Sequence, residues 1–298
     1  MSTTYLIKLS SLTLLTLIAF AANSILCRLA LDSNTIDPSS FTSIRLLSGA
    51  FVLFIIIRIW SSNHSANAKG SWVASLMLFV YAATFSYAYL SLDTGTGALV
   101  LFGSVQITMI LLSLIAGTRL QLSEWLGLGI AFTGFVYLIL PDVTTPSLTG
   151  FILMTIAGIS WGVYTLKGRG SVNPLMDTAY NFVRTIPFVL VLAIFTLDDL
   201  MLSYEGGLLA LTSGAITSGL GYTIWYIVLR DLTPTQAAVI QLSVPVIAAF
   251  GGVIFVAEYI TPRLMIASLL VLGGIFLVIL GKHFYTLSIT NARSDADR

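Results

Sequence analysis

Two arginines lie inside apolar stretches of the sequence, where a charged side chain is costly unless it has a partner or a function. Arg45 lies in the apolar stretch 39–60 and Arg184 in the stretch 176–197. Each guanidinium is suited to attract the carboxylate of a solute through charge-assisted hydrogen bonds. Alternatively, each lies near a helix end, where Arg reaches the membrane surface or binds neighbouring carbonyl groups. Both arginines are therefore candidate solute-binding residues, with a structural role as the alternative.

Three side-chain amides lie away from the ends of apolar stretches. Pro245, inside the stretch 235–256, is expected to remove the helical hydrogen bond to the carbonyl of Gln241. Polar groups freed in hydrocarbon must face a wet cavity or another helix. Gln106 in the stretch 97–117 and Asn23 in the stretch 9–31 are in a similar position. We expect all three amides to contact solute, or else to join helices.

Aromatic residues are concentrated in the stretches 71–91, 149–167 and 207–229. Membrane-interface belts explain the aromatic residues near the ends of these stretches. The candidates for contact with solute are Tyr81, Trp161, Tyr164 and Tyr222. Small residues such as Gly158 and Gly162 accompany them and also favour close helix packing.

The chemistry that the sequence lacks is equally informative. Its 13 acidic residues fall in connections, tails or the last turns of apolar stretches, so no proton-relay carboxylate is evident. Near the membrane surface, Glu258 can pair with Arg263 and Glu124 with Arg119. The sequence contains no HExxH, GxSxG or P-loop motif. We therefore expect no enzyme activity, catalytic residue, cofactor or metal.

The elements that must position these residues are membrane helices. Hydrophobic residues make up 57% of the chain and charged residues only 9%, too few to cover a soluble domain of 298 residues. A net charge of +1 leaves no basic excess for nucleic acid. Helical spans of about 20 residues are predicted at 9–31, 39–60, 71–91, 97–117, 123–141, 149–167, 176–197, 207–229, 235–256 and 262–282. The prediction is an all-α, ten-helix integral membrane protein.

The distribution of Lys and Arg predicts the orientation. With the N-terminus in the cytoplasm, the inner side collects Lys8, Arg58, Lys69, Arg119, Lys167, Arg169, Arg230, Lys282, Arg293 and Arg298. The outer connections keep only Arg28 and Arg263. We expect a multi-pass protein of the bacterial inner membrane, with both termini in the cytoplasm.

An internal repeat relates the two halves of the chain. Arg184 follows Arg45 by 139 positions (184 − 45), and Lys167 follows Arg28 by the same offset. Each half holds five predicted spans, an odd number, so the second half enters the membrane inverted. Inverted repeats around a midplane site are the basis of alternating access. The expected organisation is a repeat at 1–141, a second at 149–282 and a polar cytoplasmic tail at 283–298, with the repeats surrounding a central cavity.

With these features the sequence resembles the EamA-type transporters of the drug/metabolite transporter superfamily. The residues that carry the resemblance in the second half are Trp161-Gly162, Lys167, Arg184, Ala237-Ala238-Val239, Pro245, Glu258 and Gly273. The first half keeps Arg45, Ala98, Glu124 and Gly134 but has Gln106 in place of the family's Pro. The resemblance implies ten helices with spans 5 and 10 outside the central group. It also implies export of small metabolites, with amino acids, including aromatic ones as in YddG-type exporters, as the leading class.

The expected partners are a small-molecule solute and the lipid bilayer, and the sequence leaves a homo-oligomer open. Two alternatives remain at this stage. One is a receptor or assembly scaffold that transports nothing, and the other is a transporter of another solute class, such as nucleotide sugars.

Overall fold

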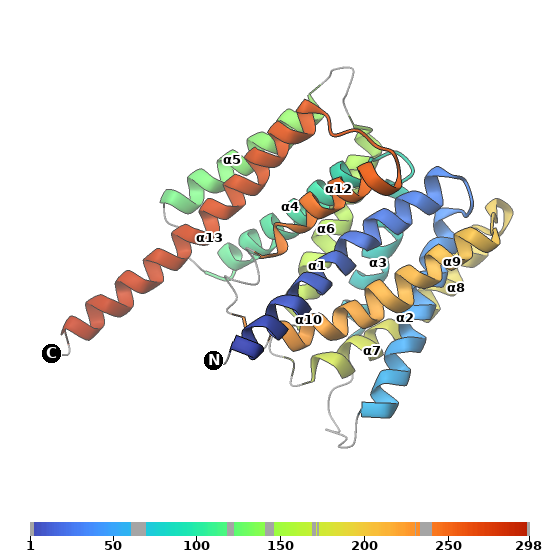
Figure 1. Cartoon of the computed structure of the whole chain (residues 1–298), viewed down its shortest axis with the longest axis horizontal. Coiled ribbons are helices and arrows are strands. Elements are labelled where there is room, and N and C mark those ends of the chain that lie inside the picture. The colour runs from blue at the N-terminus through green and yellow to red at the C-terminus, as the bar shows by residue number, and fades with distance from the viewer. Residues whose placement is uncertain are drawn as a thin grey trace.

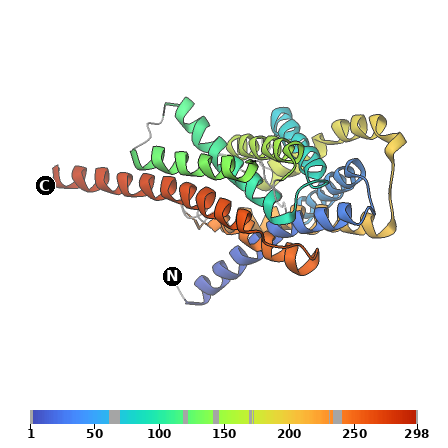
Figure 2. The same cartoon turned by 90° about the horizontal axis from the view of Figure 1, so that it is seen from above.

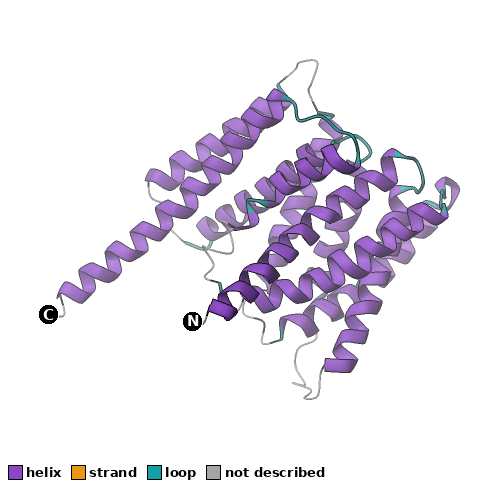
Figure 3. Cartoon of the chain, in the orientation of Figure 1, coloured by secondary structure: helices purple, strands orange, loops and turns teal. Residues whose placement is uncertain are grey.

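The computed structural model describes residues 3–60, 70–117, 122–140, 146–168, 171, 173–229, 231–232 and 240–296. Several residues used above lie outside the described residues, namely Lys69, Arg119, Arg169, Arg230, Arg298 and 237–239. Over the described ranges the chain is helical, without a named strand (Figure 3). The one isolated β-bridge there joins Ile36 to Leu202.

The helices follow the predicted spans. Their bounds are α1 Thr3–Asp32, α2 Pro38–Trp60, α3 Trp72–Ala88, α4 Thr94–Ile115, α5 Leu122–Ile139, α6 Leu148–Gly168, α7 Pro174–Arg184, α8 Ile186–Phe195, η1 Leu197–Asp199, α9 Tyr204–Thr212, η2 Ser213–Leu220, α10 Gly221–Leu229, α12 Val244–Phe255 and α13 Pro262–Ala296. In the described part, seven helices are long and apolar enough to cross a membrane. The third, eighth and ninth spans are shorter or interrupted and complete the ten helices of the fold.

Three spans are interrupted, and proline explains one interruption directly. The seventh span divides at Thr185 into α7 and α8, as Pro187 predicts by removing the bond to the carbonyl of Val183. In the ninth span the chain turns at residues 242–243 and α12 starts at Val244, so Pro245 occupies the first helical turn, where its missing N–H costs nothing.

The eighth span changes its helical type halfway along. Its middle part, η2, is a π-helix between α9 and α10, and η2 packs against α1 and α2. Segments of π-helix occur often at functional sites, because they displace side chains from the α-helical register. No proline lies within Ser213–Leu220, and the residue types there do not predict this change.

The helices form a main group and a separate pair. In the main group α3 and α4 pack on α6, α2 on η2, and α12 on α1 and α4. The helices α5 and α13 lie side by side at one end of the molecule and border α4 (Figure 1). Spans 5 and 10 therefore lie outside the main group. The helix α13 continues through residues 283–296, so most of the predicted tail is helical and extends past the other helices (Figure 2).

Glycines bring the helix axes close together. A Cβ atom on Gly158 of α6 would lie 2.5 Å from Ser104 Cβ of α4, and one on Gly127 of α5 would lie 2.5 Å from the carbonyl oxygen of Gly274 of α13. Such contacts permit the close packing on which helices in a bilayer depend. Large apolar side chains such as Phe51, Phe195 and Leu269 remain exposed, as expected for a surface that faces lipid.

Candidate functional site

Arg45 lies in the centre of the main group with 2% of its surface exposed. It is on α2, two turns after the helix begins. Its Nη2 donates a hydrogen bond to Tyr81 Oη at 2.9 Å, and its Nε donates to Ser218 Oγ at 3.3 Å. Its Nη1 is buried and has no hydrogen-bond partner among the described residues. A buried guanidinium therefore keeps one nitrogen available for an acceptor that the described residues do not supply.

Four aromatic side chains surround this position and form what we call the aromatic cluster: Tyr81, Trp161, Tyr164 and Tyr222. The Trp161 ring stacks on Tyr164 and on Tyr222, each with centroids 5.2 Å apart and planes at 29°. The Tyr81 ring lies 4.8 Å from Trp161, and Arg45 Cζ lies 5.3 Å from the Tyr81 centroid. The cluster thus joins α3, α6 and α10 beside the charge, and its rings occupy the central space in this conformation.

A stripe of aromatic residues along α3 leads away from Arg45. Tyr81, Phe85 and Tyr89 are spaced by four residues, so they lie on one face of the chain at successive turns. Arg45 Cζ also lies 4.9 Å from the Phe85 centroid. The Phe85 and Tyr89 rings meet edge to face at 4.8 Å. A continuous series of contacts therefore connects the buried charge with the end of α3.

Asn23 connects α1 to the π-helix. Its Oδ1 accepts hydrogen bonds from Ser213 Oγ at 2.9 Å, from Thr217 Oγ1, and from Ser218 Oγ at 3.3 Å. Because Ser218 also accepts from Arg45, Asn23 is linked to the guanidinium through one hydroxyl. Close approach of α2 depends on Gly214, since a Cβ there would overlap the carbonyl oxygen of Arg45. The π-helix therefore positions both polar residues.

The three other predicted residues lie on other segments of the chain, namely α4, α7 and the segment before α12. Gln106 is buried on α4, and its Nε2 has no hydrogen-bond partner in the described part. Arg184 is half-buried at the end of α7, where its Cζ lies 5.6 Å from the centroid of the Trp72 ring. Gln241 is half-buried next to the undescribed residues 233–239. The two arginines related by the repeat thus have different surroundings.

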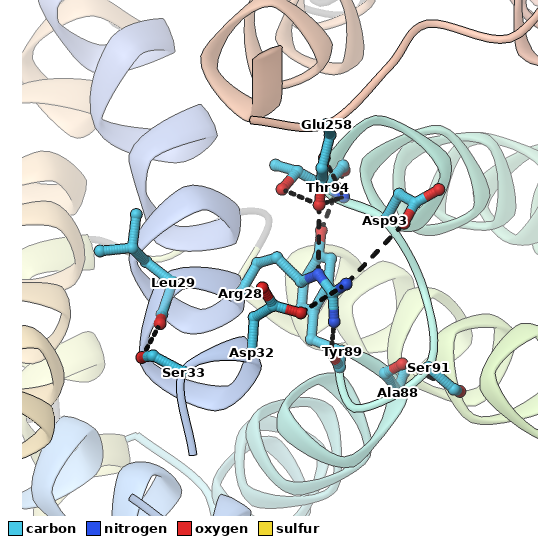
Figure 4. Close-up of polar contacts among 10 residues, drawn as sticks. All are labelled: Arg28, Leu29, Asp32, Ser33, Ala88, Tyr89, Ser91, Asp93, Thr94 and Glu258. Atoms are coloured by element: carbon cyan, nitrogen blue, oxygen red, sulfur yellow. Dashed lines mark hydrogen bonds and ion pairs between the residues drawn. The ribbon is translucent and has the colours of Figure 1, made fainter. Parts of the chain in front are cut away.

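A second polar group closes the end of the bundle where α3 ends and α4 begins (Figure 4). Glu258 accepts hydrogen bonds from Arg28 Nε at 3.1 Å, from Thr94 N at 2.9 Å and from Thr94 Oγ1 at 3.1 Å. The backbone at Ala257 has a φ of 57°. This left-handed turn after α12 places the Glu258 carboxylate at the N-terminus of α4, where negative charge is favoured.

Arg28 extends this group to the end of α3. Its Nη1 donates to the carbonyl oxygen of Tyr89 at 3.0 Å, and its Nη2 lies 2.9 Å from Asp32 Oδ1 and 3.8 Å from Asp93 Oδ1. We call the six residues Arg28, Asp32, Tyr89, Asp93, Thr94 and Glu258 the outer network, after the side on which the Lys and Arg distribution predicts this end to lie. Arg28 lies on α1, within the predicted span 9–31. The expected pairing of Glu258 with Arg263 is wrong, because Glu258 pairs with Arg28.

Arg263 makes its contacts at the pair of helices α5 and α13 instead. Its Nη1 donates to the carbonyl oxygen of Leu138 at 3.2 Å and to that of Leu140. These carbonyl groups lie at the C-terminal end of α5. No later helical N–H group is present to donate a hydrogen bond to them. A cation at this end also complements the helix dipole. Arg263 therefore ties α13 to α5.

The opposite end of α3 is held by α7. Gly70 N donates to Asp177 Oδ1 at 2.7 Å, and Ser71 N donates to Asn181 Oδ1 at 2.9 Å. These N–H groups belong to the two residues directly before α3, of which Ser71 is the N-cap. The helix α3 therefore has one polar network at each end and the buried Arg45 contact between them.

These features define a ten-helix, multi-pass membrane protein with a charged residue at its centre. A family comparison then gives the particular class. Residues 8–140 and residues 148–280 each match the EamA-like transporter family. The chain belongs to this family, which is part of the drug/metabolite transporter superfamily. It is therefore a transporter that lies in a lipid bilayer and takes a small-molecule solute.

Similar proteins agree with this class. An uncharacterized protein of Pseudomonas aeruginosa is 47% identical over 90% of this chain and 93% of its own length. The uncharacterized transporter YoaV of Bacillus subtilis is 21% identical over 81% of this chain and 87% of its own length. A protein of known crystal structure superposes with a TM-score of 0.63 at 18% identity, covering 91% of this chain and 98% of that protein. The last similarity shows the shared fold.

Proposed function

We propose that the protein exports small carboxylate metabolites, with amino acids, including aromatic ones, as the leading class. The observation that carries this proposal is Arg45, a buried guanidinium with one unpartnered nitrogen beside the aromatic cluster. A buried charge without a counter-charge is unfavourable. A solute carboxylate would supply both the missing acceptor and the missing charge.

The aromatic cluster supplies the second half of the recognition. Trp161, Tyr164 and Tyr222 already stack on one another, and a planar side chain of a solute could replace one of these contacts. Aromatic pairs gain about 0.5–1.5 kcal/mol beyond the burial of their area. Replacement of a contact between two rings of the protein by a contact between one ring and an aromatic solute would therefore cost little free energy.

Alternating access requires that the two ends of the site open in turn. We assign the outer network to the external closure and the contacts of Gly70 and Ser71 with α7 to the internal side. This assignment places both termini in the cytoplasm, as the Lys and Arg distribution predicts. Tyr81, Phe85 and Tyr89 connect the site to the outer network, since the carbonyl of Tyr89 accepts from Arg28. Solute at Arg45 can thereby influence the closure.

The proposed energy source is the gradient of the solute itself. The acidic residues that the structure describes around α1, α4 and α12 belong to the outer network rather than to the site. With the membrane potential clamped to zero, an imposed pH gradient should drive no accumulation of a zwitterionic solute. Accumulation that a protonophore abolishes would contradict this mechanism.

The experiment that tests the proposed function is a counterflow screen in proteoliposomes containing only the purified protein. Vesicles loaded with one unlabelled amino acid at a time are diluted into trace labelled phenylalanine. We expect aromatic amino acids to give saturable, transient accumulation. Efflux from preloaded cells then determines the direction. Counterflow no greater than in protein-free vesicles for every amino acid would contradict the proposal.

A further inference from the structure

We propose that the site around Arg45 recognises the carboxylate of its solute and provides no site for an ammonium group. Aromatic carboxylates that lack the amino group should therefore bind at least as well as the corresponding amino acids. This inference rests on the proposed function and specifies its substrate class.

The charge of the site favours an anion over a zwitterion. Both hydrogen bonds of Arg45 go to neutral hydroxyl groups, those of Tyr81 and Ser218. The three ion pairs found between described residues all belong to Arg28, and none includes Arg45. The site thus carries an uncompensated positive charge. An anion neutralises this charge, whereas a zwitterion brings a second positive charge into the same buried volume.

The hydrogen-bonding groups of the site also favour a carboxylate over an ammonium group. Arg45 Nη1 is a buried donor without a partner, and such a donor fits a carboxylate oxygen. An ammonium group needs acceptors instead. The oxygen atoms that accept from the guanidinium, Ser218 Oγ and Tyr81 Oη, already face a cation, and the neighbouring Asn23 Oδ1 accepts from three hydroxyl groups.

The aromatic faces of the site are occupied, although free aromatic faces can bind a cation. The Trp161 ring is stacked on Tyr164 and on Tyr222. The guanidinium of Arg45 already lies over the rings of Tyr81 and Phe85. A second cation at these rings would be repelled by the first. The arrangement therefore favours a flat apolar group next to a carboxylate.

The test uses three ligands with the same ring and chain but different charges: 3-phenylpropionate, phenylalanine and 2-phenylethylamine. Binding to the purified full chain is measured by quenching of its tryptophan fluorescence and by calorimetry. We expect 3-phenylpropionate to bind at least as tightly as phenylalanine, and 2-phenylethylamine to bind about 100-fold more weakly than 3-phenylpropionate. Tighter binding of phenylalanine by about tenfold or more, or equal binding of the amine, would overturn the inference.

Variants of Arg45 assign the effect to this residue. Arg45→Gln should weaken binding of 3-phenylpropionate by about tenfold or more and remove its advantage over the amine. Arg58→Gln, at the exposed end of the same helix, is the matched control and should leave the order unchanged. If Arg45→Gln does not fold, Arg45→Lys keeps the charge and should keep the order of the three ligands. An unchanged order in a folded Arg45→Gln protein would contradict the assignment.

The inference and the proposed function can fail separately. If phenylalanine shows counterflow and 3-phenylpropionate does not bind, the inference is wrong and the transport function stands. If 3-phenylpropionate binds as expected but no amino acid shows counterflow, the recognition stands and the amino-acid assignment is wrong. If none of the three ligands binds and no counterflow is seen, both are wrong.

Discussion

Removal of the Glu258 charge should open the outer end of the bundle. Glu258→Gln removes the less exposed of the two carboxylates next to the Arg28 guanidinium and leaves it the half-exposed Asp32. The Arg28 and Glu258 side chains are only 14% and 11% exposed. Removal of one partner from a buried pair costs about 3–5 kcal/mol. Because both side chains keep some exposure, we take the lower limit of about 3 kcal/mol, which raises the open population about 150-fold.

The chain contains its own reporter of this opening. Cys27 is its single cysteine, is fully buried, and directly precedes Arg28. A thiol reagent can react with Cys27 only when the region opens, so the labelling rate follows the open population when opening is fast. In detergent, Glu258→Gln and Arg28→Gln should each label about 100-fold faster than the wild type.

A matched control and a double variant make this experiment decisive. Asp32→Asn removes a half-exposed partner of Arg28 and should change the rate less than about threefold. The double variant Arg28→Gln with Glu258→Gln should label much more slowly than the product of the two single effects predicts, because both remove the same interaction. Unchanged labelling in both single variants, with helical content preserved, would refute the role of the network in closure.

Three further predictions concern packing, the second arginine and topology. Gly214→Ala should lower the yield of folded protein, because the new Cβ would overlap Ser48 Oγ and the Arg45 carbonyl; Gly129→Ala, which meets nothing within 4 Å, should leave the yield unchanged. Arg184→Gln should shift the melting temperature less than Arg45→Gln, since Arg184 is half-buried at the end of α7 whereas Arg45 is 2% exposed in the main group; an equal or larger shift would contradict this. Reporters fused after residues 65 and 170 should both read cytoplasmic and one after residue 202 external; positions 65 and 170 on opposite sides would contradict the orientation.

The sequence predicts the spans better than it predicts their contacts. Hydropathy and the repeat lead to ten helices, and Pro187 marks the break between α7 and α8. The residue types also select Arg45 as a costly buried charge. The sequence treats Arg184 as its equivalent, and only packing distinguishes them, because Arg45 is covered by η2 and α3 whereas Arg184 lies beside the exposed Trp72.

Hydropathy and residue type do not predict the long-range partners or the π-helix. Arg28 and Glu258 are 230 residues apart, and proximity in sequence favoured Arg263 instead. The π-helix at Ser213–Leu220 carries no proline or other local marker. Its register follows from the tertiary contacts of Asn23 and Gly214. No feature of the sequence distinguishes Ser218 from other small residues, and its contact with Arg45 is a product of that register.

The most direct test of the central claim is phenylalanine counterflow measured side by side for the wild type, Arg45→Gln and Arg58→Gln in proteoliposomes with equal amounts of folded protein. We predict saturable counterflow for the wild type and Arg58→Gln, and a reduction of about tenfold or more for Arg45→Gln. Full counterflow by folded Arg45→Gln would show that the buried guanidinium does not bind the transported carboxylate.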